Sequence, residues 1–145
     1  MKAKTVVRSV VGVVVGAVVW MIGFYTLAAL LAMLWPDFAQ HGRRFMTDGV
    51  FTFTTAMAVC NLVFWVLAEI FAGWLAMKTA RRREAIRVLA GLIGLYLAAM
   101  HIALYWPRFP WWYNLLVVIP AVPAVLFGAK LAANVEASVD SGVLV

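Results

Sequence analysis

The chain has 145 residues, of which 66% are hydrophobic and only 12% are charged, and its formal net charge is +6. So few polar residues cannot cover a core of this size in water, and the high hydrophobicity excludes a disordered chain. The composition therefore predicts an integral membrane protein. A spanning helix needs about 20 apolar residues, so about four helices fit in this length, as one transmembrane domain over residues 1–145.

Four apolar stretches are long enough to cross a membrane, and they predict an all-α fold, a four-helix transmembrane bundle. In chain order the helices are expected over residues 10–34, 51–77, 88–106 and 111–133. The first stretch follows Lys2, Lys4 and Arg8 as in a signal peptide, but about 25 apolar residues favour a retained helix. The polar stretch 36–48 is expected to be an outer loop, and residues 134–145 a frayed tail.

Basic residues predict the orientation, because cytoplasmic loops are enriched in lysine and arginine. If the N-terminus is cytoplasmic, nine of the twelve basic residues lie inside and only Arg43, Arg44 and Arg108 lie outside. This split predicts that both termini are cytoplasmic and that helices adjacent in the chain are antiparallel. Aromatic residues crowd the turn between the third and fourth helices and fit an interfacial belt on the outer side, namely Tyr105, Trp106, Phe109, Trp111, Trp112 and Tyr113.

The basic run that contains Arg81, Arg82 and Arg83 is the strongest local charge feature. We expect it to fix the topology, and it can also contact anionic lipid headgroups or a partner protein. Nucleic acid is not an expected partner, because the charges adjoin apolar spans and the lipid surface accounts for them.

Small residues recur at helical spacing in every predicted span, and membrane helices associate by close packing over such residues. The candidate packing positions are Gly12, Gly16, Gly73, Gly91, Gly94 and Gly128. We expect them to hold the bundle together within one chain. The alternative is that the GxxxG pair Gly12 and Gly16 forms a homodimer seam.

Two prolines, Pro120 and Pro123, lie near the middle of the fourth predicted helix. Each removes a backbone donor and should kink the helix. Carbonyl groups freed at membrane depth need another partner or a wet cavity. The kink is therefore either tolerated within the bundle or serves as a hinge beside a substrate-facing groove.

Glu69 is the one acidic residue inside a predicted span. A charged carboxylate near the bilayer centre costs at least about 2.5–3.5 kcal/mol, so Glu69 should be protonated, paired or in contact with water. Lys130 lies on the cytoplasmic side of the same level, and we expect the two residues to pair. The pair would be structural, whereas the alternative is that Glu69 is a proton or cation site.

Asn61 and His101 fall at a similar level toward the outer side, and a hydrogen bond between them is predicted. No metal or cofactor is expected. The other histidine, His41, lies in the outer loop, so the bundle offers no second histidine for haem, and Cys60 is a single cysteine. No catalytic triad, HExxH motif or phosphate-binding glycine loop is present, so catalytic residues are not predicted either.

The second predicted helix ends in Ala72-Gly73 and Ala76 before the basic run, and the fourth reads Pro123, then Gly128, then Leu-Ala. This pattern resembles a group of small bacterial four-span membrane proteins that has no known activity. In that group a double glycine stands where this chain has Ala72-Gly73. The resemblance implies a four-helix fold in the bacterial inner membrane.

The sequence thus favours a small inner-membrane protein with a structural, accessory or interaction role. Such a protein would pack against a second copy or a larger membrane complex. The alternative is a small oligomeric transporter or channel that uses Glu69 as a proton- or cation-coupled site.

Overall fold

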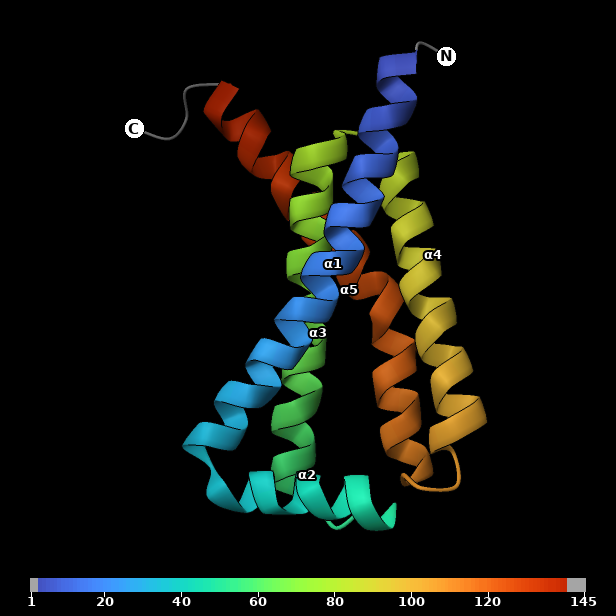
Figure 1. Cartoon of the computed structure of the whole chain (residues 1–145). Helices are drawn as coiled ribbons and strands as arrows, with labels where there is room; N and C mark the ends of the chain where they lie inside the picture. Colours follow the sequence, from blue (N-terminus) through green and yellow to red (C-terminus); the bar gives the residue numbers. More distant parts are fainter. Residues whose placement is uncertain (1–2, 141–145) are drawn as a thin grey trace.

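The computed structural model describes the backbone of residues 3–140 and the side chains of residues 3–135, and the described chain is almost entirely helical (Figure 1). Its elements are α1 (Ala3–Leu34), α2 (Pro36–Asp48), α3 (Thr55–Ala80), α4 (Arg83–Met100), the π-helical turn η1 (His101–Tyr105) and α5 (Trp111–Asp140). Four segments are long and apolar enough to span a membrane: α1, α3, α4 continued by η1, and α5 as far as Val135. The predicted all-α bundle is confirmed, and the chain has the character of an integral membrane protein.

The helix bounds differ from the predicted ones mainly at the polar ends. The first helix begins at Ala3, the third element reaches Ala80, and the last helix continues to Asp140 through part of the predicted tail. A helix can extend past the apolar stretch because it satisfies its own backbone hydrogen bonds in water as well as in lipid.

α2 is a helix where an outer loop was predicted. Pro36 stands at its first turn and Asp37 follows, both favourable at a helix N-terminus. It ends at Gly49, whose positive φ of 69° suits glycine and whose N–H donates to the carbonyl of Phe45. α2 lies crosswise below the spanning helices, at the end of the bundle opposite the start of α1 and the end of α5 (Figure 1).

The apolar side of α2 is anchored to the bundle by Phe38. This ring is buried with Leu31 of α1 and Met57 of α3 in a small cluster separate from the main core. The main core lies between α1, α3, α4 and α5 and is rich in alanine along α3. Consecutive spanning helices run antiparallel, as predicted, but the most extensive contact joins α3 and α5, which run in the same direction (Figure 1).

α3 and α5 meet through two glycines. Gly73 packs against the backbone of Val125, and Gly128 packs against the backbone of Ile70. A Cβ atom at either glycine would overlap the carbonyl oxygen of the opposing helix. The two helices therefore cross backbone to backbone, in the manner that small residues permit in membranes.

α1 uses its glycines within the same chain. Gly12 faces Ala80, and Gly16 faces Ala76 and Leu89, with both glycines buried. A homodimer seam at this pair is thus the wrong interpretation, because α3 and α4 already occupy the stripe. Gly94 faces the Val122 side chain of α5.

Gly91 does not pack against another helix, contrary to the prediction. No atom lies within 4 Å of the position that its Cβ would take, and the residue is exposed. It stands between buried Ala90 and Ile93 in the sequence but lies on the outward side of α4. Hydropathy alone does not reveal this rotation of a helix that is apolar nearly all round.

α5 bends in its middle, where Pro120 and Pro123 lie inside the helix (Figure 1). The first half follows α4, and the second half leans away past α3. The predicted kink is therefore present, and its geometry lets one helix pack against two neighbours.

Candidate functional site

An aromatic cavity of about 480 Å³ lies in the half of the bundle nearest α2. Residues of four helical segments line it, from Trp20 to Ala28 of α1, Phe38 to Met46 of α2, Ala58 to Trp65 of α3, and Tyr96 to Tyr105 of α4 and η1. The other lining residues are Phe51 and Phe53, before α3, and Phe109 and Tyr113, at the start of α5. Twelve of the lining side chains are Phe, Tyr or Trp. We call this space the aromatic cavity.

Helical spacing brings the aromatic side chains together. Trp20, Phe24 and Ala28 recur every four residues and share one face of α1, as Asn61 and Trp65 do on α3. Phe24 stacks on Trp65 with 3.7 Å between ring centroids, and Trp20 meets Tyr96 edge-on at 5.6 Å. The inner end of the cavity is therefore formed by interlocked rings from three helices.

The end of the cavity nearest α5 carries a second group of rings. Phe109 stacks on Tyr113 at 4.9 Å, and Phe51 lies 5.4 Å from Tyr113. Phe109 and Tyr113 belong to the group that was predicted to form an interfacial belt at the lipid headgroups. Instead Tyr113 is buried, because the first turn of α5 inserts between α3 and η1.

His101 is held at the cavity wall by Asn114 of α5. Nδ1 of His101 lies 2.7 Å from Oδ1 of Asn114, and both residues are buried. Nδ2 of Asn114 donates to the carbonyl oxygens of Phe109 and Pro110, at 3.2 and 3.4 Å. Since those carbonyls can only accept, the amide orientation is fixed and Oδ1 must accept from Nδ1–H of His101.

This arrangement selects one tautomer of the imidazole. With the proton on Nδ1, a neutral His101 has an unprotonated Nε2 with a free lone pair. The residue lines the aromatic cavity, so the cavity wall contains a hydrogen-bond acceptor. His101 is the first residue of η1, the π-helical turn that ends the α4 segment.

Asn61 forms the second polar contact of the cavity. Its Nδ2 donates to the hydroxyl of Tyr113 over 2.6 Å. The predicted bond between Asn61 and His101 is therefore wrong, although both residues line the same cavity. Each is instead paired with one of two consecutive α5 residues, Tyr113 and Asn114.

Sequence reasoning missed Tyr113 and Asn114 as site residues. The sequence did contain a weak signal for this site, because Asn114 is the only asparagine in the apolar stretch 111–133. A buried amide needs partners, so such an isolated asparagine indicates a helix-to-helix contact.

Glu69 lies deeper in the bundle and does not line the aromatic cavity, whereas Trp65, one turn earlier, does. Its exposed fraction is 0%, and neither carboxyl oxygen has a hydrogen-bond partner among the described residues. Lys130 is exposed, so the predicted ion pair does not form. Gly128, Ala129 and Ala132 form the inward face of α5, and Lys130 lies on the opposite face.

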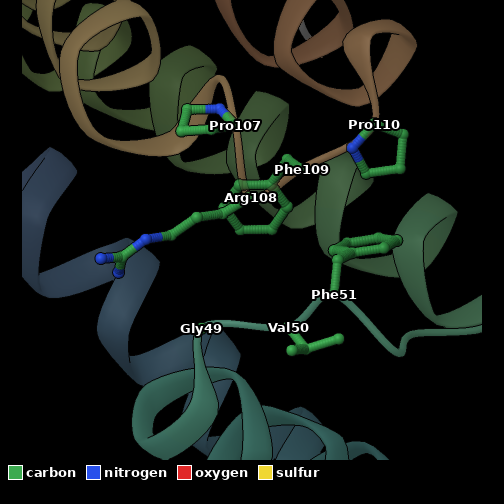
Figure 2. Close-up of a pocket in the computed structure, with 7 residues that line it drawn as sticks. All are labelled: Gly49, Val50, Phe51, Pro107, Arg108, Phe109 and Pro110. Carbon is green, nitrogen blue, oxygen red and sulfur yellow. The ribbon is translucent and has the colours of Figure 1, made fainter.

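A second, shallower cavity of about 430 Å³ adjoins the aromatic cavity, with which it shares Phe51 and Phe109. Its other walls are the segments Gly49–Val50 and Pro107–Arg108 with Pro110 (Figure 2). Arg108 extends away from the two rings and over Gly49, where a Cβ would lie 3.7 Å from its Nε. This cavity brings one cation to the α2 end of the bundle.

The prolines of α5 are not among the residues that line either cavity. Within the described part of the chain, no three His, Cys, Asp or Glu side chains gather in a way that could hold a metal ion. The arrangement of the site is suited to binding, with many rings and two oriented polar contacts.

Comparison with protein-family models, with curated proteins and with solved structures finds no match to this chain. The resemblance to small bacterial four-span proteins therefore stays a prediction. The function has to be inferred from the chemistry of the site.

Proposed function

We propose that this protein is a small bacterial inner-membrane protein that binds a lipid-soluble molecule in its aromatic cavity, as an accessory or interaction subunit without catalytic activity. The main support for this proposal is the aromatic cavity itself. Its volume of about 480 Å³ falls within the range of about 300–1,000 Å³ that is typical of small-molecule sites. Mostly apolar walls with few oriented polar groups are the usual composition of such sites.

The proposed orientation places both termini in the cytoplasm and α2 at the outer surface. Its support is the predominance of basic residues near the ends of the chain and in the α3–α4 turn. In this orientation Arg81, Arg82 and Arg83 meet the anionic lipid of the inner leaflet, and the aromatic cavity is in the outer leaflet. A second copy or a larger membrane complex would contact the lipid-facing helix surfaces.

A matched pair of glycine substitutions tests the binding proposal. Gly42 lines the aromatic cavity, and no atom lies within 4 Å of the position of its Cβ. Gly91 is equally open but is not part of the cavity lining. Gly42→Phe should therefore fill the cavity, and Gly91→Phe should add the same ring elsewhere.

The measurement is quenching of tryptophan fluorescence by 2-bromonaphthalene, with the purified protein in lipid nanodiscs. Trp20 and Trp65 line the cavity, so a bound quencher should act on them directly. We expect saturable quenching in the wild type and in Gly91→Phe, and its loss in Gly42→Phe. Linear, equal quenching in all three proteins would overturn the proposal, because it would reflect partition into lipid alone.

A second candidate function is proton- or cation-coupled transport through Glu69. The observation that favours it is the complete burial of a carboxyl group without a hydrogen-bond partner among the described residues. Ionisable residues inside membrane spans are costly, and they often mark ion pathways.

Liposome flux separates this candidate from the first. Transport predicts pH-dependent flux that Glu69→Gln abolishes and that Glu84→Gln leaves intact, since Glu84 is exposed at the start of α4. Equal flux in the wild type and Glu69→Gln would reject Glu69 as a coupling site. A strictly monomeric mass after correction for detergent would argue against an oligomeric transporter.

A further inference from the structure

We infer that the ligand of the aromatic cavity is an uncharged, lipid-soluble phenol, whose hydroxyl group donates a hydrogen bond to Nε2 of His101. This inference rests on the proposed binding function and specifies the chemical class of the ligand. It depends on three features of the cavity, namely an acceptor, a nearby hydroxyl and flat apolar walls.

The acceptor is His101 in a fixed tautomer. The chain that fixes it runs from the carbonyls of Phe109 and Pro110 through the Asn114 amide to Nδ1 of the imidazole. The carbonyls fix the orientation of the amide and the amide oxygen fixes the proton on Nδ1, so Nε2 of the neutral imidazole accepts and does not donate. Nε2 has no hydrogen-bond partner among the described residues, and it is not one of the fully enclosed polar atoms, unlike Nε1 of Trp20 in the same cavity wall. A ligand donor can therefore supply the partner of this acceptor.

The second polar group is the hydroxyl of Tyr113. It accepts from Nδ2 of Asn61 over 2.6 Å, which leaves its own proton to donate. Tyr113 and Asn114 are consecutive residues in the first turn of α5, and His101 bonds to the second of them. A phenolic oxygen is chemically suited to a cavity that contains these two groups, because it can donate to an imidazole nitrogen and can accept from a hydroxyl.

The apolar walls favour a flat, neutral molecule. Stacked pairs of rings, Phe24 on Trp65 and Phe109 on Tyr113, present planar faces at both ends of the cavity. Among the described residues that line the cavity, none is an Asp, Glu, Lys or Arg. A charged ligand would have no counter-ion at this depth, and an aliphatic alcohol would not use the ring faces.

A pair of probes that differ only in the donor tests the inference. 2-Naphthol has the phenolic proton, and 2-methoxynaphthalene replaces it with a methyl group on the same ring system. Affinities are measured in nanodiscs by competition against quenching by 2-bromonaphthalene. We expect the wild type to bind the naphthol about tenfold more tightly than the ether, the ratio that one well-made hydrogen bond gives.

Two histidine variants assign that ratio to Nε2. In His101→Phe the ratio should fall to about one, mainly through weaker naphthol binding. His41→Phe should leave it at about tenfold, because His41 bonds to Thr52 and does not line the cavity. A ratio that survives in His101→Phe would overturn the inference.

The ratio of naphthol to ether affinity in the wild type is itself a test of the inference. The inference therefore stays testable if His101→Phe does not fold. Equal binding of naphthol and ether by the wild type would reject the phenol and leave the binding function in place. Binding of neither probe, together with no saturable quenching, would reject the proposed function itself.

Discussion

Glu69 and His101 are both buried polar residues, but they differ in whether a hydrogen-bond partner lies beside them. His101 is joined through Asn114 to two backbone carbonyls, so its Nδ1–H is satisfied. Glu69 is fully buried, and neither of its carboxyl oxygens has a hydrogen-bond partner in the described part of the chain. A satisfied polar network adds specificity to a membrane bundle, whereas an unsatisfied carboxyl group destabilises the fold.

Replacement of Glu69 by an apolar residue of similar length should therefore stabilise the protein. Glu69→Met removes the unsatisfied group without a large change in volume, and we expect a gain of about 1–3 kcal/mol, seen as a higher unfolding temperature. Lys130→Met should have no effect, because Lys130 is exposed and does not pair with Glu69. If Glu69→Met instead lowers the unfolding temperature, the carboxyl group has a partner in the membrane that the isolated chain lacks.

The His101–Asn114 contact should behave as a coupled pair. Asn114→Leu leaves Nδ1–H of His101 without its acceptor and removes the side-chain donor of the Phe109 carbonyl, at a cost of about 1–3 kcal/mol. Adding His101→Phe to this variant removes the orphaned imidazole, so the double variant should be less destabilised than the sum of the single ones. Denaturation of the four proteins of this cycle measures the coupling, and additive effects would show that the bond contributes nothing.

The sequence identified Glu69, Asn61 and His101 as residues that need an explanation, but it paired them wrongly. Polar residues at membrane depth are visible in any hydropathy profile because they are rare there. Their partners depend on the rotation and height of each helix, and α1, α3 and α5 are too uniformly apolar to define a preferred face. Tyr113 was therefore assigned to the lipid interface, and Asn114 was not recognised as a site residue.

At the scale of elements, α2 shows how a polar stretch can be misread. Residues 36–48 are too polar to span, so hydropathy assigned them to a loop. The helix signals were nevertheless present in Pro36, Asp37 and Gly49, and Phe38 and Phe45 are spaced by two turns on one face. An amphipathic helix of this kind lies along a membrane interface and can cover a cavity that opens toward it.

The crossing of α3 and α5 should be the element contact least tolerant of substitution. Gly73→Ala and Gly128→Ala each place a methyl group on the carbonyl of the other helix, and backbone atoms cannot move aside as a side chain can. We expect each variant to be destabilised by at least about 1–3 kcal/mol and to give a lower yield of folded protein.

Gly91→Ala is the matched control for these substitutions, because its Cβ would meet no neighbour. It should be neutral or slightly stabilising, as alanine is the better helix former. Thermal unfolding of the three variants in one detergent compares them directly. Similar loss in all three would mean that helix propensity, and not the crossing, determines the effect.

At the scale of the whole molecule, the number of spans and their order followed from the sequence, whereas the arrangement around the cavity did not. Length and hydropathy determine how many helices fit, and short connections make chain neighbours antiparallel. α2 lies crosswise at one end and supplies part of the cavity wall, while α5 bends where its prolines lie (Figure 1). Both features are geometric, and neither changes the hydropathy profile enough to be recognised there.

The two ends of the bundle differ strongly in charge, and this difference predicts which end faces the cytoplasm. The starts of α1 and α4 lie at one end, with the basic residues of the α3–α4 turn, while Arg43, Arg44 and Arg108 lie at the α2 end (Figure 1). Nine basic residues against three is a large bias for short loops, so the basic end should face the cytoplasm.

Cysteine labelling can read this orientation, because Cys60 is the only cysteine and can be replaced by serine. In that background, Arg43→Cys on α2 and Arg83→Cys at the start of α4 place one exposed thiol at each end. A membrane-impermeant maleimide added to intact bacterial spheroplasts should label Arg43→Cys at once and Arg83→Cys only after permeabilisation. The reverse pattern would invert the topology and place the cavity in the inner leaflet. Equal labelling of both positions would mean that the chain inserts in two orientations, as an antiparallel dimer requires.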